Sequence, residues 1–289
     1  MKNVLGLCVG IGLTLSTASG LRAQAPPPPG PPKVLQIFRE EVKPGKAPAH
    51  QKWETGWPKA FAKANWPTNY LAITSVTGPG EAWFLTGYDS FVAWEKDRQN
   101  LDKNAALKAE DDRLTQGDGE FLSGHRSIVA VLREDLSSKA KVTLPKMRYF
   151  QVATFRVRPG HDSDFVDAAK IVLAAYEKAN VERAWATYQI SSGMLGPTYM
   201  VFLPMKSLEE IDSALARGKA IQDAEGEEGQ KKLQKFASDG YLSVESNIYA
   251  FEPKMSYPAK EFAGADPEFW NPKPAPAAKK PAPKPAAKP

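Results

Sequence analysis

The feature that most constrains this chain is an internal repeat, in which two segments of similar sequence lie about 115 residues apart. Residues 38–45 match residues 153–160 at an offset of 115, and both segments end in a basic residue followed by Pro-Gly. The offset holds without a gap to residues 61–65 against 176–180, and it drifts to 120 near the end of the second copy. An ordered series of matches of this length predicts a duplicated structural unit. The chain length of 289 residues suits two domains of ordinary size and agrees with this interpretation.

Each copy has the pattern of a β-α-β-β-α-β unit, because hydrophobic alternation predicts strands and a period of 3.6 residues predicts helices. Strands are expected at 34–43, 69–77, 82–88 and 121–132 in the first copy, and at 148–158, 184–193, 197–204 and 241–252 in the second. Helices are expected at 46–65 and 161–180, and again from Ser90 and Ser207 onward. This order is typical of the ferredoxin-like unit. The expected fold class is therefore α+β, with two tandem ferredoxin-like units.

Three local signals refine the expected helices. Gly56 and Pro58 weaken the centre of the first helix in copy one. Ser207 and Glu210 have the spacing of a capping box, which predicts the start of the last long helix. The acidic run at 225–228 lacks the spacing of a calcium loop and is predicted to be a solvated turn.

Beyond the two copies, the chain has segments of biased composition. Residues 1–25 have the pattern of a signal peptide, since Lys2 precedes an uncharged stretch and Ala23 and Ala25 offer a cleavage site. The single cysteine, Cys8, falls in this segment, so no disulfide or thiolate site is expected after cleavage near Ala25. The predicted division is a signal peptide (1–25), a Pro-rich linker (26–33), a first repeat (34–133), a linker (134–146), a second repeat (147–253) and a C-terminal extension with a disordered Lys/Pro/Ala-rich tail (254–289). We therefore expect an exported protein, periplasmic or extracellular.

The positive charge of the chain belongs to its two ends. The net charge is +5 and the pI is near 9.0. Residues 1–25 contain two basic residues, residues 271–289 contain five lysines, and neither segment contains an acid, so residues 26–270 carry a net charge of −2. A mildly acidic body argues against a nucleic-acid-binding core. The lysine-rich tail is either a solvated spacer or a cationic tether to an anionic envelope surface, and the sequence leaves both open.

The repeated segments resemble a known superfamily. Strands that end in Val42-Lys43-Pro44-Gly45 and Val157-Arg158-Pro159-Gly160, followed by a helix, a hairpin and a Ser-initiated helix, are similar to those of the dimeric α/β-barrel proteins. The nearest types are the NIPSNAP-like and antibiotic-biosynthesis-monooxygenase-like domains. In that superfamily two units pack sheet against sheet, so the resemblance implies that the tandem copies form an intramolecular pseudo-dimeric α/β barrel.

The resemblance leaves the activity open. Members of the superfamily include cofactor-free monooxygenases, haem-degrading and haem-binding enzymes, isomerases and proteins of unknown activity. The haem-degrading members use an Asn, a Trp and a His, and this triad cannot be placed in the present sequence. No cofactor is therefore predicted, and haem stays an alternative.

One helix face in the first copy is the main candidate site. His50, Trp53, Trp57 and Phe61 share a face by their spacing, whereas the matching residues of the second copy form a plain apolar stripe. Trp83, on the hairpin that follows, completes the candidate set. These residues favour a pocket for a flat apolar or aromatic molecule, with His50 as hydrogen-bond partner, base or axial ligand. The alternative is a packed core that contains a hydrogen-bonded histidine.

A second candidate lies on the first strand of each copy. Arg39 and Glu41 match a threonine and Arg156, and Glu41 could pair with Arg156 if the two sheets face each other. His125 is expected at a solvated position matching Glu245, and His161 at the start of a helix. These histidine spacings match no metal-ligand motif, so no metal site is predicted.

The sequence therefore predicts an exported tandem barrel protein that binds a small apolar or aromatic molecule, with its activity unassigned. An oxygenase-type enzyme of the same superfamily, cofactor-independent or haem-dependent, is the first alternative. A structural envelope module held by its cationic tail is the second. The choice between a monomer and a homo-oligomer is left open.

Overall fold

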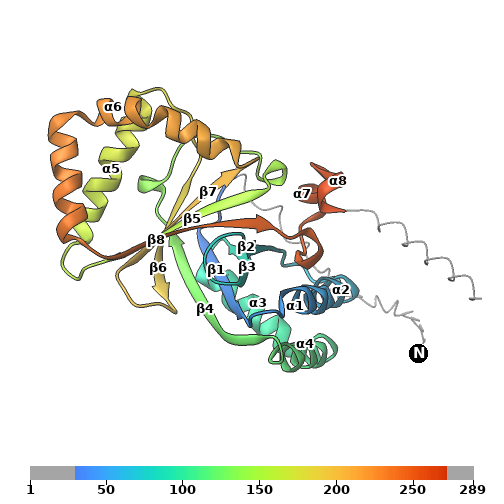
Figure 1. Ribbon diagram of the computed structural model, residues 1–289. Helices are drawn as coiled ribbons and strands as arrows, with labels where there is room; N and C mark the ends of the chain where they lie inside the picture. The colour runs from blue at the N-terminus through green and yellow to red at the C-terminus, as the bar shows by residue number, and fades with distance from the viewer. Residues whose placement is uncertain (1–29, 272–289) are drawn as a thin grey trace, which may run out of the picture.

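The computed structural model of the chain describes residues 30–271 (Figure 1). Its strands are β1 (Val34–Val42), β2 (Tyr70–Ser75), β3 (Glu81–Tyr88), β4 (Leu122–Leu132), β5 (Tyr149–Val157), β6 (Ala186–Ser192), β7 (Thr198–Met205) and β8 (Tyr241–Phe251). All eight begin and end within two residues of the predicted ranges. The predicted signal peptide, most of the Pro-rich linker and the Lys-rich tail lie outside the described residues, so the interpretations placed on them stay predictions.

The strands close into one antiparallel barrel in the order β1-β3-β2-β8-β5-β7-β6-β4. Both halves of the chain show the same order, β4-β1-β3-β2 in the first and β8-β5-β7-β6 in the second. The halves join where β2 pairs with β8 and where β4 pairs with β6. Every one of these strands therefore has a hydrogen-bonded neighbour on both sides, which removes exposed sheet edges. The fold is a mixed α+β structure built on a closed eight-stranded antiparallel barrel.

The backbone repeats its conformation at the offset seen in the sequence. Three pairs of residues with positive φ lie 115 residues apart: Gly45 and Gly160, Asn65 and Asn180, and Gly78 and Gly193. In the last strand of each half, matching residues are 119 rather than 120 positions apart. The strand pairing shows this, because His125 lies opposite Glu40 in the first half and Val244 lies opposite Phe155, the counterpart of Glu40, in the second. His125 therefore corresponds to Val244, and its predicted match with Glu245 was wrong by one residue.

Helices cover the outside of the barrel (Figure 1). They are α1 (Ala47–Glu54), α2 (Gly56–Lys63), α3 (Phe91–Lys103) and α4 (Ala105–Asp118) on the first half, α5 (Asp162–Lys178) and α6 (Glu209–Asp239) on the second, and α7 (Lys260–Gly264) and α8 (Pro267–Trp270) after β8. The helix predicted at 46–65 is broken at Thr55 into α1 and α2, as Gly56 and Pro58 indicated. Gly56 is also needed for packing, because a Cβ there would lie 2.6 Å from Leu114 Cδ2 of α4.

Two local predictions at α6 were wrong. The acidic run at 225–228 lies within α6, which continues through a kink where Gly226 has a φ of 71°. Ser207 does not cap this helix; instead the Glu210 carboxylate accepts a 2.7 Å hydrogen bond from the backbone N–H four residues earlier. Ser90, in contrast, caps the start of α3. Its Oγ accepts a 3.1 Å hydrogen bond from the backbone N–H three residues later.

The main core fills the barrel and is apolar at one end. Trp270 of α8 packs against this end, where its Nε1 donates to the Pro145 carbonyl at 2.7 Å and its ring lies 5.7 Å from that of Phe251. The extension predicted from residue 254 is thus packed on the barrel as far as Trp270. Within residues 30–271, no helix combines the length and hydrophobicity needed to cross a membrane.

Candidate functional site

One histidine and three carboxyl groups meet in the layer between the barrel and its helices. Glu40 comes from β1, His50 and Glu54 from α1, and Asp118 from the last residue of α4. All four residues are buried, with exposed fractions between 1% and 4%. One potential ligand atom from each lies within 4.8 Å of the other three. We call these four residues the carboxylate–histidine cluster.

Local geometry explains how β1 and α1 supply three of these side chains. Side chains alternate along a strand, so Glu40 points outward while Arg39 and Glu41 point into the barrel. His50 and Glu54 are four residues apart on α1, which places both on one face of the helix. That face is turned toward the outward side of β1, so the three side chains converge.

Close packing of α4 against α1 supplies the fourth. Gly117 lies against the Trp53 indole, and a Cβ at Gly117 would be only 2.1 Å from Trp53 Cζ2. The indole Nε1 donates a 3.0 Å hydrogen bond to the Leu114 carbonyl, which holds the two helices together. Because the glycine permits this approach, Asp118 reaches His50 from the end of α4.

The His50 Nε2 atom faces all three carboxyl groups. It lies 2.9 Å from Glu40 Oε2, 3.5 Å from Asp118 Oδ1 and 3.7 Å from Glu54 Oε1. Two of these oxygens, Glu54 Oε1 and Asp118 Oδ1, are buried and have no hydrogen-bond partner among the described residues. Such atoms are rare in folded proteins and often mark a site that binds something.

Burial dominates the protonation of the cluster. Desolvation and the charge of Asp118 raise the pKa of Glu40 to about 9. Desolvation and the charges of Glu40 and Asp118 raise the pKa of Glu54 to about 10. Burial also raises the pKa of Asp118, and it lowers the pKa of His50 although the charge of Asp118 opposes this. In the described structure His50 is the sole ion-pair partner of these carboxyl groups, so Glu40 and Glu54 retain protons at neutral pH.

The second half of the chain has an apolar core at the same place. The 115-residue offset aligns Glu40 with Phe155, His50 with Phe165, and Glu54 with Ala169. Phe155 and Phe165 pack with ring centroids 5.7 Å apart, and Phe165 is only 4% exposed. Since an apolar core satisfies the fold in one half, the buried carboxyl groups in the other half point to a function.

The other aromatic residues predicted for this site divide between two faces of the sheet. Trp53 packs beside the cluster, and a hydrogen bond from the Trp57 side chain partly opposes the effect of burial on the pKa of Glu54. Phe61 packs on Trp57 with ring centroids 6.2 Å apart. Trp83, in contrast, is 2% exposed within the barrel core, on the opposite face of the sheet from His50. Trp83 and His50 therefore do not line one pocket.

A groove of about 530 Å³ lies on the other side of α1, away from the cluster. Its lining includes Gln51 and Lys52 of α1 and Lys254 and Phe269 from the segment after β8. None of the aromatic residues predicted for the ligand pocket lines this groove.

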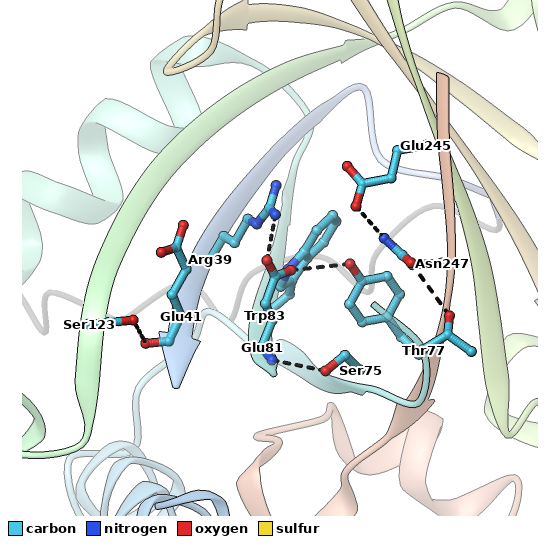
Figure 2. A network of polar contacts seen from close by, with 10 residues as sticks. Arg39, Glu41, Ser75, Thr77, Glu81, Trp83, Ser123, Glu245 and Asn247 are labelled. Atoms are coloured by element: carbon cyan, nitrogen blue, oxygen red, sulfur yellow. Dashed lines mark hydrogen bonds and ion pairs between the residues drawn. The ribbon is translucent and has the colours of Figure 1, made fainter. Parts of the chain in front are cut away.

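Arg39 and Glu41, which belong to the second candidate site predicted from the sequence, lie at the polar end of the barrel (Figure 2). Arg39 Nη2 lies 2.5 Å from Glu81 Oε1, while Glu81 Oε2 accepts hydrogen bonds from Trp83 Nε1 at 2.8 Å and from the Tyr249 hydroxyl at 3.2 Å. Arg39 thus pairs within its own half of the chain. Among residues 30–271 no ion pair joins Glu41 to Arg156, so the predicted pairing between copies is not formed.

The two remaining histidines are not members of the cluster, although His125 lies directly opposite Glu40 on the neighbouring strand β4. The exposed His125 ring stacks on Phe38 with centroids 5.5 Å apart. His161 Nδ1 lies 2.7 Å from Asp164 Oδ2 at the start of α5. Neither contributes to the carboxylate–histidine cluster.

The cluster has the donor set of a metal site, although the sequence predicted none. Ligands 2.0–2.2 Å from a first-row ion lie about 3 to 4 Å from one another, and the Nε2–oxygen distances of 2.9–3.7 Å in the cluster fall near this range. His50 does not fit an axial haem ligand, because its Nε2 is already surrounded by three carboxyl groups. Haem therefore stays an alternative that this histidine does not support.

Comparison with known proteins identifies the fold. No protein-family model matches the chain, and no curated protein matches it in sequence. A candidate monooxygenase from Fusobacterium nucleatum subsp. nucleatum is similar in structure with a TM-score of 0.51 and 13% identity, over 75% of this chain and 91% of that one. An anthrone oxidase-like protein has a TM-score of 0.50 and 17% identity, over 79% and 95% of the two chains. The chain therefore has the dimeric α/β-barrel fold, as the sequence motifs predicted.

Proposed function

We propose that this protein binds one divalent first-row metal ion, Mn²⁺ or Fe²⁺, at Glu40, His50, Glu54 and Asp118, and acts as an oxygenase-type enzyme. The observation that carries the proposal is the buried cluster itself, in which four ligand groups have donor atoms within 4.8 Å of one another. When bound, such an ion supplies Lewis acidity and one-electron redox chemistry.

Charge balance supports a cation at this position. Three carboxylates in a dry site repel one another and require a counter-charge, and His50 alone offers at most one. A dication would offset two of the three negative charges and would also coordinate the two buried oxygens that lack hydrogen-bond partners. The same residues would otherwise hold protons, so metal and protons compete for the cluster.

The donor types favour particular metals. Carboxylate oxygens suit Mg²⁺, Ca²⁺ and Mn²⁺, whereas imidazole suits iron, zinc and copper. A site with one imidazole and three carboxylates combines both preferences, which Mn²⁺ and Fe²⁺ accept. We therefore expect Mg²⁺ and Ca²⁺ to bind more weakly than Mn²⁺.

Metal binding is tested by titrating chelator-treated protein with Mn²⁺ and following the loss of the free-ion electron paramagnetic resonance signal. We expect one ion per chain. We expect His50→Ala and Asp118→Asn each to weaken binding at least tenfold, because each removes one of four ligands. His161→Ala is the matched control, since that histidine lies at the start of α5 in the second half of the chain, where it pairs with Asp164 and not with the cluster. Equal affinity in His50→Ala and wild type would overturn the proposed site.

The proposed activity is suggested by the two structural neighbours, a candidate monooxygenase and an anthrone oxidase-like protein, with which this chain shares only the fold. Anthrone is the probe substrate, because its oxidation to anthraquinone takes up one O₂, adds one oxygen atom to the ring carbon and releases the other as water. We expect Fe²⁺-loaded protein to increase oxygen uptake over metal-free protein and over Fe²⁺-treated His50→Ala. Oxygen uptake equal in all three samples would reject an anthrone oxidase activity while leaving the metal site to its own test.

We also infer that the chain arose by duplication of a ferredoxin-like unit. Support comes from the strand order shared by the two halves and from the three positive-φ pairs spaced 115 residues apart. In this interpretation the second half retained an apolar core between sheet and helices, and the first half acquired the metal ligands at equivalent positions.

A further inference from the structure

A groove of about 500 Å³ lies in the second half of the chain, between the first part of α6 and the segment that joins the two halves. Its lining includes five basic side chains and two acidic ones, which are Lys141, Lys146, Arg183, Lys206 and Arg217 against Glu182 and Glu210. None of these five cations forms an ion pair with another side chain of residues 30–271. The groove therefore concentrates unpaired positive charge, although residues 26–270 as a whole carry a net charge of −2.

Most of the remaining lining of this groove is apolar or aromatic. These side chains include Val142, Met147, Tyr176, Val181, Pro204, Ala214 and Ile221. Apolar walls with a few charged groups, in a space of this size, are typical of sites that bind small organic molecules. Because the surplus charge is positive, the groove suits an organic anion.

Large side chains occupy the equivalent space in the first half. Ser138 and Tyr257 hold equivalent positions, because each donates its backbone N–H to a carbonyl and the two carbonyl residues lie 115 positions apart. The rings of Tyr257 and Trp66 both pack on Phe61, with centroids 5.9 Å and 6.5 Å from it. The 115-residue offset aligns Trp66 with Val181. Since serine and valine replace two large rings, the second half has room for the groove at this place.

The second half also lacks a carboxylate that the first half has at this place. In the first half, Asp97 of α3 accepts hydrogen bonds from the Thr68 hydroxyl and, at 3.0 Å, from the Tyr88 hydroxyl. The registers of β1 with β3 and of β5 with β7 give an offset of 117 at the end of the hairpin, which aligns Asp97 with Ala214. The offset of 115 aligns Thr68 with Arg183. Arg183 and Ala214 both line the groove, so a cation replaces a hydroxyl and a methyl group replaces its carboxylate partner.

We propose that this groove binds a small carboxylate with an apolar body, whose carboxylate group pairs with Arg183 in place of the missing aspartate. Arg183 Nη2 donates a 3.1 Å hydrogen bond to Gln151 Oε1, and its carbonyl accepts a 2.6 Å hydrogen bond from the Ser138 hydroxyl. These contacts hold the arginine at the groove while other N–H groups of its guanidinium stay available for a planar carboxylate. The site lies in the second half of the chain and does not depend on the proposed metal site.

The test measures the binding of 2-naphthoate to the full chain by isothermal titration calorimetry. Its neutral analogue 2-naphthylmethanol has nearly the same size and apolar surface and lacks only the charge. We expect one 2-naphthoate per chain and an affinity for 2-naphthylmethanol that is at least about tenfold lower, because hydrogen bonds to a charged group are the stronger ones. Physiological ionic strength in the buffer screens attraction by distant surface charges.

Two substitutions test opposite walls of the groove. Arg183→Met removes the cation and keeps the length of the side chain, and we expect it to weaken 2-naphthoate binding about tenfold or more. Arg98→Met is the matched control, since Arg98 stacks on Trp94 in the first half. Ala214→Asp restores the carboxylate of the first half and should also weaken binding about tenfold, because it pairs with the arginine that the ligand needs. Ala214→Asn, of nearly the same shape without the charge, should bind at least about threefold more tightly than Ala214→Asp.

Three results would overturn the inference. Equal affinity of wild type for 2-naphthoate and 2-naphthylmethanol would show that the groove does not recognise the carboxylate. Wild-type affinity in both Arg183→Met and Ala214→Asp would place the bound molecule elsewhere on the chain. Absence of 2-naphthoate binding to wild type at millimolar concentration would reject the ligand class. Thermal unfolding identifies a variant that does not fold, and the substitution on the opposite wall then decides the outcome.

Discussion

Replacing Glu54 by glutamine should make the metal-free protein less sensitive to pH. Glu54 is 1% exposed, its Oε1 has no hydrogen-bond partner, and burial together with the charges of Glu40 and Asp118 raises its pKa from 4.5 to about 10. Between these two pH values the folded protein holds a proton that the unfolded chain releases. The stability contributed by this proton is fully present below about pH 4.5 and is lost as the pH rises toward 10.

The size of the effect follows from linkage. One group that holds a proton only in the folded state lowers the free energy of unfolding by about 1.4 kcal/mol for each pH unit. From pH 6 to pH 8 the loss due to Glu54 is therefore about 3 kcal/mol. Glutamine has nearly the same shape and does not titrate, so Glu54→Gln should lack this part of the decline. The decline due to Glu40, whose pKa is raised to about 9, should remain in both proteins.

Urea unfolding with a chelator at pH 6, 7 and 8 measures this difference. The control is Glu120→Gln, because the Glu120 side chain is 72% exposed and its replacement should leave the pH dependence of wild type intact. At pH 8, Mn²⁺ at a hundred times the wild-type Kd should add about 2.7 kcal/mol to the stability of wild type and at most about 1.4 kcal/mol to that of Glu54→Gln, whose Kd should be at least tenfold higher. Parallel pH dependence in wild type and Glu54→Gln would refute the protonation of the cluster that we describe.

Three further predictions test the packing around the site and the barrel. Arg39→Met should lower the free energy of unfolding by about 3 kcal/mol, since Glu81 would lose its cation inside the barrel; urea unfolding within 0.5 kcal/mol of wild type would contradict this. Ser90→Ala should cost about 1 kcal/mol and Ser207→Ala almost nothing, because only Ser90 caps its helix; equal losses would show that the caps were misassigned. Gly117→Ala should destabilise by about 1–3 kcal/mol through its clash with the neighbouring indole, although alanine is the better helix former; an increase in melting temperature would show that the indole moves aside without cost.

Much of the fold could be predicted because its strands and helices follow local patterns. Alternation along 34–43 predicted a strand, and β1 spans Val34–Val42. Gly56 and Pro58 predicted a weakened helix, and the break between α1 and α2 lies at Thr55. The acidic run at 225–228 misled the prediction, because glycine and charge are typical of turns. In the structure this segment continues α6 through a kink at Gly226, which takes a positive φ.

The candidate site could be predicted only in part. His50 stood out because its counterpart Phe165 is apolar. The same comparison between the two copies could also have identified Glu40, since Glu40 aligns with the apolar Phe155 at the same offset. On its own strand Glu40 sits between Arg39 and Glu41 and reads as one of several solvated charges. Nothing in the sequence connected Asp118 with this group, because no short motif spans the distance along the chain.

The sequence by itself determined the repeat, the order of strands and helices, and the face of each that must be buried, because these depend on periodicities within a few residues. Only the tertiary structure decided how β2 meets β8 and β4 meets β6, since strand closure depends on long-range pairing. It also decided that Glu40, His50, Glu54 and Asp118 share one dry space. The pKa of a carboxyl group and its affinity for a metal depend on that surrounding space, whose walls come from segments far apart in the chain.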